Sequence, residues 1–195
     1  MLDFAVNARH ARPPVWLTER LAARLTDLAR YPSRDDERAA VQAVAARHGR
    51  GPDEVALLAG AAEGFALLPN LRPTLAAVIA PSFTEPDVAL TTAGVEVRHV
   101  VLDPPFGLAG VRVPDTADLV LVGNPTNPTS VLHTREQILA LRRPGRIVVV
   151  DEAFADSVPG EPESLAGESL PDVLVLRSLT KTWSLAGLRV GYALG

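Results

Sequence analysis

The chain of 195 residues carries 19 lysines and arginines against 23 aspartates and glutamates, a net charge of −4, and no cysteine. Without cysteine, disulfides, zinc sites with thiolate ligands and thiol nucleophiles are excluded. The mildly acidic balance offers no obvious basic face that could neutralise the phosphates of a nucleic acid. No segment has the roughly 18 apolar residues of a membrane helix. We therefore expect a cytoplasmic protein that binds neither nucleic acid nor membranes.

Apolar spacing predicts helices over 15–29 and 36–48, the second ended by Gly49 and Gly51. Uniformly apolar runs, typical of a sheet buried on both faces, then predict seven strands at 55–59, 76–80, 95–102, 119–122, 147–150, 173–176 and 190–194. Crossover helices are expected over 62–71, 85–93 and 135–142, and a loop over 159–170. The expected fold class is α/β, with a mostly parallel seven-stranded sheet and helices on both faces.

Polar segments follow three of the predicted strands, at 123–129, 151–154 and 178–183. Open α/β sheets bind ligands at the carboxyl ends of their strands, so these segments should meet at one edge of the sheet. That edge is the expected binding site.

Lys181 is the single lysine among the 19 basic residues. Arginine serves as well in surface ion pairs but cannot act as an amine nucleophile, so Lys181 is a candidate for covalent chemistry. The alternative is a lone lysine left by compositional bias. Ser178 and Arg189 flank it with anion-binding groups, a combination that suits a phosphorylated aldehyde joined to the amine as a Schiff base.

Asp151 ends an apolar strand, where a pyridinium nitrogen would be a natural partner for its carboxylate. A metal site, a general acid and a helix cap are the alternatives for the pair Asp151 and Glu152. The four histidines show no ligand spacing, so no metal is predicted.

Three further places in the chain allow two interpretations each. Ala61 and Ala62 open a helix after a strand, which suits an anion or merely tight packing. Asn127 is a ligand or ordinary turn chemistry, and Phe83 is a platform for an aromatic ring or an apolar anchor. The phosphate motifs GxxxxGK[ST] and GxGxxG are absent, which disfavours an ATPase or a dinucleotide dehydrogenase and leaves a nucleotide-binding module without a P-loop as a minor alternative.

Together these residues resemble the fold-type I pyridoxal-phosphate enzymes, specifically the class I/II aminotransferases. The resemblance is carried by Asn-Pro-Thr at 127–129, Asp-Glu-Ala-Phe at 151–154, and Ser-x-x-Lys-x-x-x-x-x-Gly-x-Arg-x-Gly at 178–191. It implies pyridoxal 5′-phosphate as the cofactor, joined to Lys181, with Asp151 on the pyridine nitrogen and Asn127 on the ring hydroxyl. It also implies Phe83 stacked on the ring and the phosphate bound by Ser178, Arg189, Ala61, Ala62 and, across a homodimer interface, Tyr31 of the other subunit.

Within this group, Asp-Phe-Ala-Val-Asn at 3–7 and Phe154 resemble the branch of histidinol-phosphate aminotransferase and, most of all, threonine-phosphate decarboxylase of cobalamin biosynthesis, a lyase. Both act on small phosphorylated amino compounds. Arg9, His10, Arg12 and Arg34 are therefore candidates for contacts with the substrate phosphate, against the alternative of solvated surface charge. The expected function is an aminotransferase or amino-acid decarboxylase that acts on a phosphorylated amino compound, most similar to threonine-phosphate decarboxylase, with a histidinol-phosphate aminotransferase as the alternative.

The chain departs from the family pattern at Ser130, where glycine is usual, and it ends at Gly195, after the last strand of the large domain. The resemblance therefore implies an N-terminal portion, with an arm and helix at 1–30, a cofactor-binding domain at 31–195, and no C-terminal small domain. A catalytically inactive fragment is a further alternative. Transamination and decarboxylation remain undecided, because the arginine that orients the substrate in this family lies outside the chain.

Overall fold

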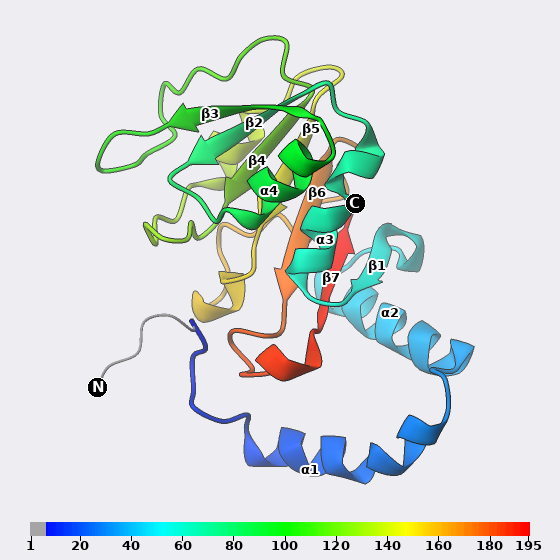
Figure 1. Ribbon diagram of the computed structural model, residues 1–195. Coiled ribbons are helices and arrows are strands. Elements are labelled where there is room, and N and C mark those ends of the chain that lie inside the picture. The colour runs from blue at the N-terminus through cyan, green and yellow to red at the C-terminus, as the bar shows by residue number, and fades with distance from the viewer. Residues whose placement is uncertain (1–6) are drawn as a thin grey trace.

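The computed structural model describes residues 7–195, so the predicted motif at 3–6 lies outside the described residues. One sheet in the order β1-β7-β6-β5-β4-β2-β3 organises them (Figure 1). Its strands are β1 (Val55–Leu58), β2 (Leu75–Ala80), β3 (Glu96–Val101), β4 (Leu119–Gly123), β5 (Ile147–Asp151), β6 (Val173–Ser178) and β7 (Gly191–Leu194). β7 is antiparallel to both neighbours and the other pairs are parallel, which confirms the mostly parallel seven-stranded sheet.

Apolar side chains alternate between the two faces of the central strands and form two cores. One core joins α3 (Ala61–Leu67), the 3-10 turn η3 (Leu68–Leu71) and α4 (Glu85–Thr92) to the face visible in Figure 1. On the opposite face, α5 (Arg135–Leu139) and the 159–170 loop contribute to the second core. Burial on both faces explains why β2, β4 and β5 read as continuous apolar runs.

The outermost strands differ from the prediction of full burial. In β3 no residue is fully buried, and the same holds for β1 at the other edge. An edge strand has one neighbour and receives less cover from helices, so its apolar residues stay partly accessible.

Helix ends follow local chemistry that the apolar periodicity did not include. α2 (Arg34–His48) begins two residues before the predicted start, because Ser33 caps it by accepting the Asp36 N–H at 3.0 Å. Gly49 ends it as predicted, with a positive φ of 66°. α5 ends at Leu139, three residues before the predicted limit, and the chain then passes through turn residues to Pro144, which would in any case stop a helix.

The first predicted helix is broken into α1 (Val15–Ala23) and a 3-10 turn, η1 (Leu25–Ala29). Neither buries a residue, and Leu25 and Leu28, expected on an apolar face, are 61% and 78% exposed. In Figure 1 both lie apart from the sheet, joined to it through α2. The boundary between an arm at 1–30 and a domain at 31–195 stays a prediction.

Candidate active site

A cavity of about 210 Å³ opens where β5 and β6 end, at the edge of the sheet that the polar segments indicated. Its walls contain the predicted site residues Ala61, Ala62, Phe83, Asn127, Asp151, Ser178, Lys181 and Arg189. Of the predicted set, Tyr31 is missing from them. We call this space the inner cavity.

Strand register explains how residues far apart in the chain meet here. Asp151, the last residue of β5, lies beside Gly123, the last residue of β4. Ser178, the last residue of β6, pairs with Gly191 at the start of the antiparallel β7, so Arg189 reaches the same edge. The ends of three strands and the start of a fourth therefore surround one space.

Asp151 brings a carboxyl group into the inner cavity, and few groups around it stabilise its charged form. Its Oδ1 accepts a hydrogen bond from the Ala153 N–H at 3.0 Å, and none of the basic side chains described forms a salt bridge with it. Burial raises the pKa of Asp151 to about 6, although Ala153 and Lys181 act in the opposite direction. A cationic ligand group would favour the charged form of this carboxyl.

Lys181 lies on a loop that the N-terminal segment holds in place. The Arg9 N–H donates to the Lys181 carbonyl oxygen at 3.0 Å, and the Trp183 ring packs edge-on against Trp16 of α1, with 5.9 Å between centroids. The lysine side chain is half-buried and lines the inner cavity. Its amine is therefore available to a ligand.

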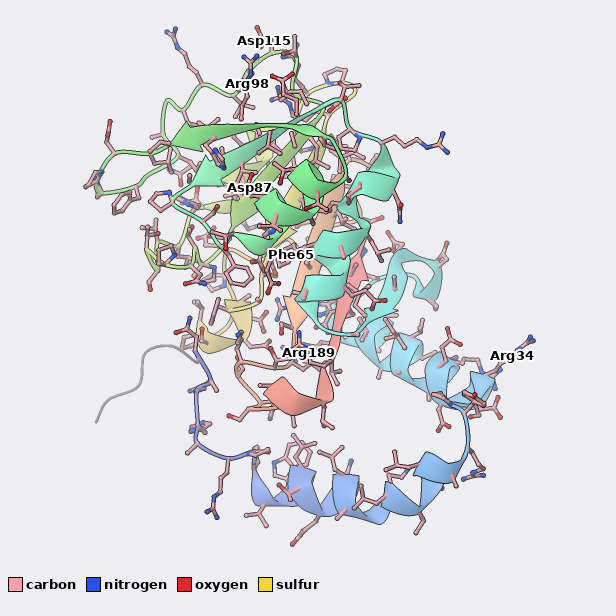
Figure 2. The ribbon with its side chains drawn as sticks, viewed as in Figure 1. Arg34, Phe65, Asp87, Arg98, Asp115 and Arg189 are labelled. Carbon is pink, nitrogen blue, oxygen red and sulfur yellow. The ribbon has the colours of Figure 1, made fainter. Side chains whose placement is uncertain are left out.

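Two glycines let the start of α3 approach the start of β7. A Cβ at Gly191 would lie 2.6 Å from the Arg177 carbonyl oxygen and 2.9 Å from Gly60 Cα. A Cβ at Gly60 would lie 2.9 Å from Arg189 Nη2. This close approach brings Ala61 and the Arg189 guanidinium, labelled near the start of β7 in Figure 2, to the same end of the cavity.

Ser178 is buried and its hydroxyl is already engaged. Its Oγ lies 2.7 Å from Thr180 Oγ1 and accepts the Thr180 N–H at 3.2 Å. Because a hydroxyl has one proton and two lone pairs, Ser178 can still bond an oxygen of a ligand.

The two asparagines of the segment 123–130 differ in what they contact. Asn124 is structural: its amide donates to the His133 carbonyl at 3.2 Å and accepts the His133 N–H at 2.8 Å. Asn127 instead lines the cavity. Ser130 has φ 59°, a left-handed conformation that glycine adopts without strain, which explains why this position favours glycine.

Phe83 can serve both as an apolar anchor and as a platform for an aromatic ring. Its ring packs against Phe65 of α3 at 6.2 Å between centroids and a 52° tilt, and 36% of the residue remains exposed on the cavity wall. The packing fixes the ring, and the exposed part is free to contact a flat ligand.

Glu152, singled out with Asp151, does not line the inner cavity. It is 1% exposed and pairs with Arg177, whose Nη1 lies 2.9 Å from Glu152 Oε2 and whose Nη2 lies 2.5 Å from Asp156 Oδ1. Successive strand residues face opposite sides, so Arg177 turns away from the cavity while Ser178 turns toward it. This buried ion pair joins the ends of β5 and β6 behind the site.

Several wall residues were missed by sequence reasoning, namely Phe65, Glu85 and Thr180. Phe65 belongs to the apolar face of α3 and carries no polar signal. Glu85 is the first residue of α4, only two positions after Phe83, and that proximity was the available hint.

The remaining candidates lie elsewhere. Tyr31, between η1 and α2, is 98% exposed, and Arg34 begins α2, far from Arg189 in Figure 2. His10 lines neither this cavity nor the space next to it, and its backbone N–H donates to Ser184 Oγ at 3.2 Å. Arg12 is exposed and lines no cavity of the site. Thus Arg9 is the one of these phosphate-contact candidates that reaches the site.

The donor set fits pyridoxal 5′-phosphate on the structure's own evidence. A partly buried carboxyl without an ion pair among the described residues, an amine, an amide, an aromatic ring and two anion-binding side chains line one cavity. In residues 7–195 no group of three histidine, aspartate or glutamate side chains is placed to hold a metal ion. None of the described helices is long and apolar enough to span a membrane.

Curated proteins are similar in sequence to this chain over all or nearly all of its length. A histidinol-phosphate aminotransferase of Mycobacterium tuberculosis is 72% identical over 195 residues, which are 100% of this chain and 54% of that protein. A threonine-phosphate decarboxylase of Salmonella typhimurium is 32% identical over 206 aligned residues, covering 98% of this chain and 56% of that protein. The chain thus spans about half the length of the curated relatives it matches.

Solved structures share the fold. A histidinol-phosphate aminotransferase from Clostridium acetobutylicum superposes with a TM-score of 0.85 at 23% identity, over 100% of this chain and 60% of that one. A histidinol-phosphate aminotransferase from Sinorhizobium meliloti, solved in complex with pyridoxal-5′-phosphate, gives 0.84 at 22% identity, over 97% and 55%. The family model "Aminotransferase class I and II" matches residues 1–195. The chain therefore belongs to the aminotransferase class I and II family, whose cofactor is pyridoxal 5′-phosphate.

Proposed function

We propose that the complete protein is an aminotransferase that acts on histidinol phosphate or a closely related phosphorylated amine. The single observation that carries the proposal is the convergence of Lys181, Asp151, Asn127, Ser178 and Arg189 on one cavity. The 72% identity to a protein named for this reaction supports the substrate, and favours it over the decarboxylase expected first. A cytoplasmic location is part of the proposal.

The part of the inner cavity lined by Asp151, Asn127 and Phe83 would hold the cofactor ring. Bound pyridoxal 5′-phosphate supplies an aldehyde that combines with amines and a ring that accepts electrons from the substrate carbon. Asp151 would hold the proton on the ring nitrogen, because a paired cation offsets the cost of its buried charge. Asn127 would bond the ring hydroxyl, and Phe83 would cover one face of the ring.

The opposite end would hold the cofactor phosphate. Arg189 supplies a charge-assisted bond, Ser178 a hydroxyl, and Ala61 and Ala62 their backbone N–H groups. The Gly60–Gly191 approach keeps these donors at one place.

Lys181 would hold the cofactor through its side-chain amine. The lysine side chain lines the inner cavity and would also move the proton at the substrate α-carbon. The same residue would thus bind the cofactor and transfer a proton.

A homodimer is part of this proposal, with Tyr31 reaching the partner's cofactor phosphate. Tyr31 is 98% exposed and lines no cavity of its own subunit's site. Val15, Trp16, Leu25 and Leu28 are also exposed apolar residues of the same arm, a surface that suits burial against a partner.

Threonine-phosphate decarboxylase is the second candidate, favoured by the 32% identity over nearly the whole chain. The two reactions differ in the bond that breaks at the α-carbon, and their products differ accordingly. Release of carbon dioxide from threonine phosphate, without amine transfer from histidinol phosphate, would favour this candidate.

The test of the proposed function uses the complete protein with added pyridoxal 5′-phosphate. Wild type should gain visible absorption and transfer the amine of histidinol phosphate to a 2-oxo acid. Lys181→Ala should show neither, and Lys181→Arg, which keeps the charge but lacks the amine chemistry, should show neither as well. Undiminished absorption in both variants would refute the assignment of Lys181.

A further inference from the structure

A second space of about 520 Å³, the outer cavity, adjoins the inner one. The two share four wall residues, Asn7, Asn127, Phe154 and Lys181. Lys181 thus borders both spaces. A molecule in the outer cavity would therefore contact Lys181 without occupying the space that Asp151, Ser178 and Arg189 line.

The charges on the walls of the two cavities differ. Glu85, Asp151, Lys181 and Arg189 line the inner cavity, so both signs are present there. Of the described residues that line the outer cavity, Arg9 and Lys181 carry charge and none is acidic. The other polar groups on its walls are amides and hydroxyls, from Asn7, Thr126, Asn127, Ser130, Ser157 and Thr182. This is the composition of an anion-binding space.

Arg9 is held at this position by its backbone. Its N–H donates to the Lys181 carbonyl oxygen at 3.0 Å. The next residue, His10, donates its N–H to Ser184 Oγ at 3.2 Å, and the same hydroxyl donates back to the His10 carbonyl at 2.8 Å. These bonds tie the arm to the loop that carries Lys181, so less conformational freedom is lost when the guanidinium binds a ligand.

The Arg9 side chain forms no ion pair with another described residue. Within residues 7–195 no carboxylate lies within 4 Å of its guanidinium, whereas many other arginines, such as Arg24, Arg38 and Arg142, are paired. An arginine that is unpaired among the described residues, on the wall of a cavity without acidic residues there, is available for an anion.

We propose that Arg9 is a substrate-binding residue that selects a phosphomonoester in the outer cavity. The inference rests on the proposed function, because it places the reacting amine at Lys181 and the phosphate at the other end of the same molecule. A planar guanidinium donates two parallel hydrogen bonds to a phosphate, and the dianion gains more from it than an uncharged hydroxyl does. Arg9 therefore separates phosphorylated amines from their unphosphorylated counterparts.

Arg12 provides a matched control on the same arm. It is an exposed arginine three positions along the chain and lines neither cavity. Arg9→Met and Arg12→Met remove the same charge from the arm, and only the first removes it from the cavity wall. Arg9→Lys keeps the charge and loses the two-pronged geometry.

The experiment compares histidinol phosphate with histidinol as amine donors for the complete protein loaded with pyridoxal 5′-phosphate. Arg9→Met should lower kcat/KM for the phosphorylated donor by about tenfold to a hundredfold, the range expected for losing hydrogen bonds to a charged group. Histidinol should change by less than about twofold, Arg9→Lys should fall between, and Arg12→Met should match wild type on both donors. An equal loss on both donors, or no loss on either, would overturn the proposal.

A binding measurement separates this proposal from the proposed function. Calorimetric titration with inorganic phosphate should give a dissociation constant that is at least about fivefold weaker in Arg9→Met than in Arg12→Met. This readout needs no turnover. If wild type transfers no amine but the phosphate affinity still depends on Arg9, the proposed function fails and the anion site stands. If turnover occurs and phosphate affinity is the same in both variants, the anion site is wrong.

Discussion

At the scale of one residue, Asp151 is a carboxyl group whose charged form is unfavourable in the folded protein. The carboxyl ends a buried strand and accepts one backbone hydrogen bond, from Ala153. Burial therefore raises its pKa to about 6 from an ordinary value of 3.8, with Glu152 and Glu85 acting in the same direction and Lys181 against it. At neutral pH, the charged form of this carboxyl therefore lowers the free energy of unfolding of the cofactor-free protein.

The sign of the pH dependence follows from this shift. Between pH 4 and 6 the folded state holds the Asp151 proton more tightly than the unfolded state, so the free energy of unfolding falls as the pH rises. Asp151→Asn should therefore stabilise the cofactor-free complete protein at pH 7.5, by up to about 3 kcal/mol, and by much less at pH 4.5. Thermal unfolding at the two pH values checks this. A variant less stable than wild type at pH 7.5 would contradict it.

At the scale of secondary-structure elements, the meeting of α3 and β7 decides where Arg189 and the start of α3 lie, at the end of the cavity that we propose for the cofactor phosphate. Strand β7 runs antiparallel and brings Gly191 against Gly60, which no side chain would permit. The sequence motif Gly-x-Arg-x-Gly contains this requirement, because Gly191 supplies backbone space while Arg189 supplies charge. Gly187, the first glycine of the motif, has no neighbour within 4 Å of a built Cβ.

The two glycines of this motif form a matched pair for substitution. Gly191→Ala places a methyl group 2.6 Å from a backbone oxygen and should lower the free energy of unfolding by about 1–3 kcal/mol. Gly187→Ala should change it by no more than about 0.5 kcal/mol, as at other unconstrained surface positions. Denaturant titration of both variants measures the difference. Equal stability of the two would show that the α3–β7 contact is looser than described.

At the scale of the whole molecule, one end of the N-terminal arm contacts the site and the other end is exposed to solvent. Arg9 bonds to the Lys181 loop, while Tyr31, 22 positions later in the numbering, is 98% exposed. A homodimer in which Tyr31 serves the partner's site would account for both ends. The proposed dimer can be tested without a structure of it.

Mixed dimers test which subunit Tyr31 serves. Tyr31→Ala alone should weaken pyridoxal 5′-phosphate binding, and Lys181→Ala alone should abolish the visible absorption. Co-expression of the two variants should restore absorption and wild-type affinity at one site of each mixed dimer, because that site draws Lys181 from one subunit and Tyr31 from the other. If Tyr31 served its own subunit, no intact site would form and affinity would stay weak.

The strands and most of the site were predictable because their signals are local. Apolar runs bounded by Pro and Gly marked every strand, to within about two residues at each end. Lys181, Asp151 and Ser178 were identified because reactive or charged side chains directly after apolar strands are unusual, and strand ends are where such sheets bind ligands. The helix limits were less accurate, because caps such as Ser33 and the Pro144–Gly145 turn compete with apolar periodicity.

By itself, then, the sequence determined the fold class, the family and the residues able to carry the chemistry, since composition and short motifs encode these. Only the tertiary structure decided that Glu152 faces away to Arg177, that Glu85 and Phe65 join the wall, and that Arg9 lies beside Lys181 while Arg34 does not. These outcomes depend on strand register, on which way side chains face and on contacts between distant segments, such as Arg9 and Lys181, which are 172 positions apart. Such long-range relations arise when the chain packs, and no local pattern contains them.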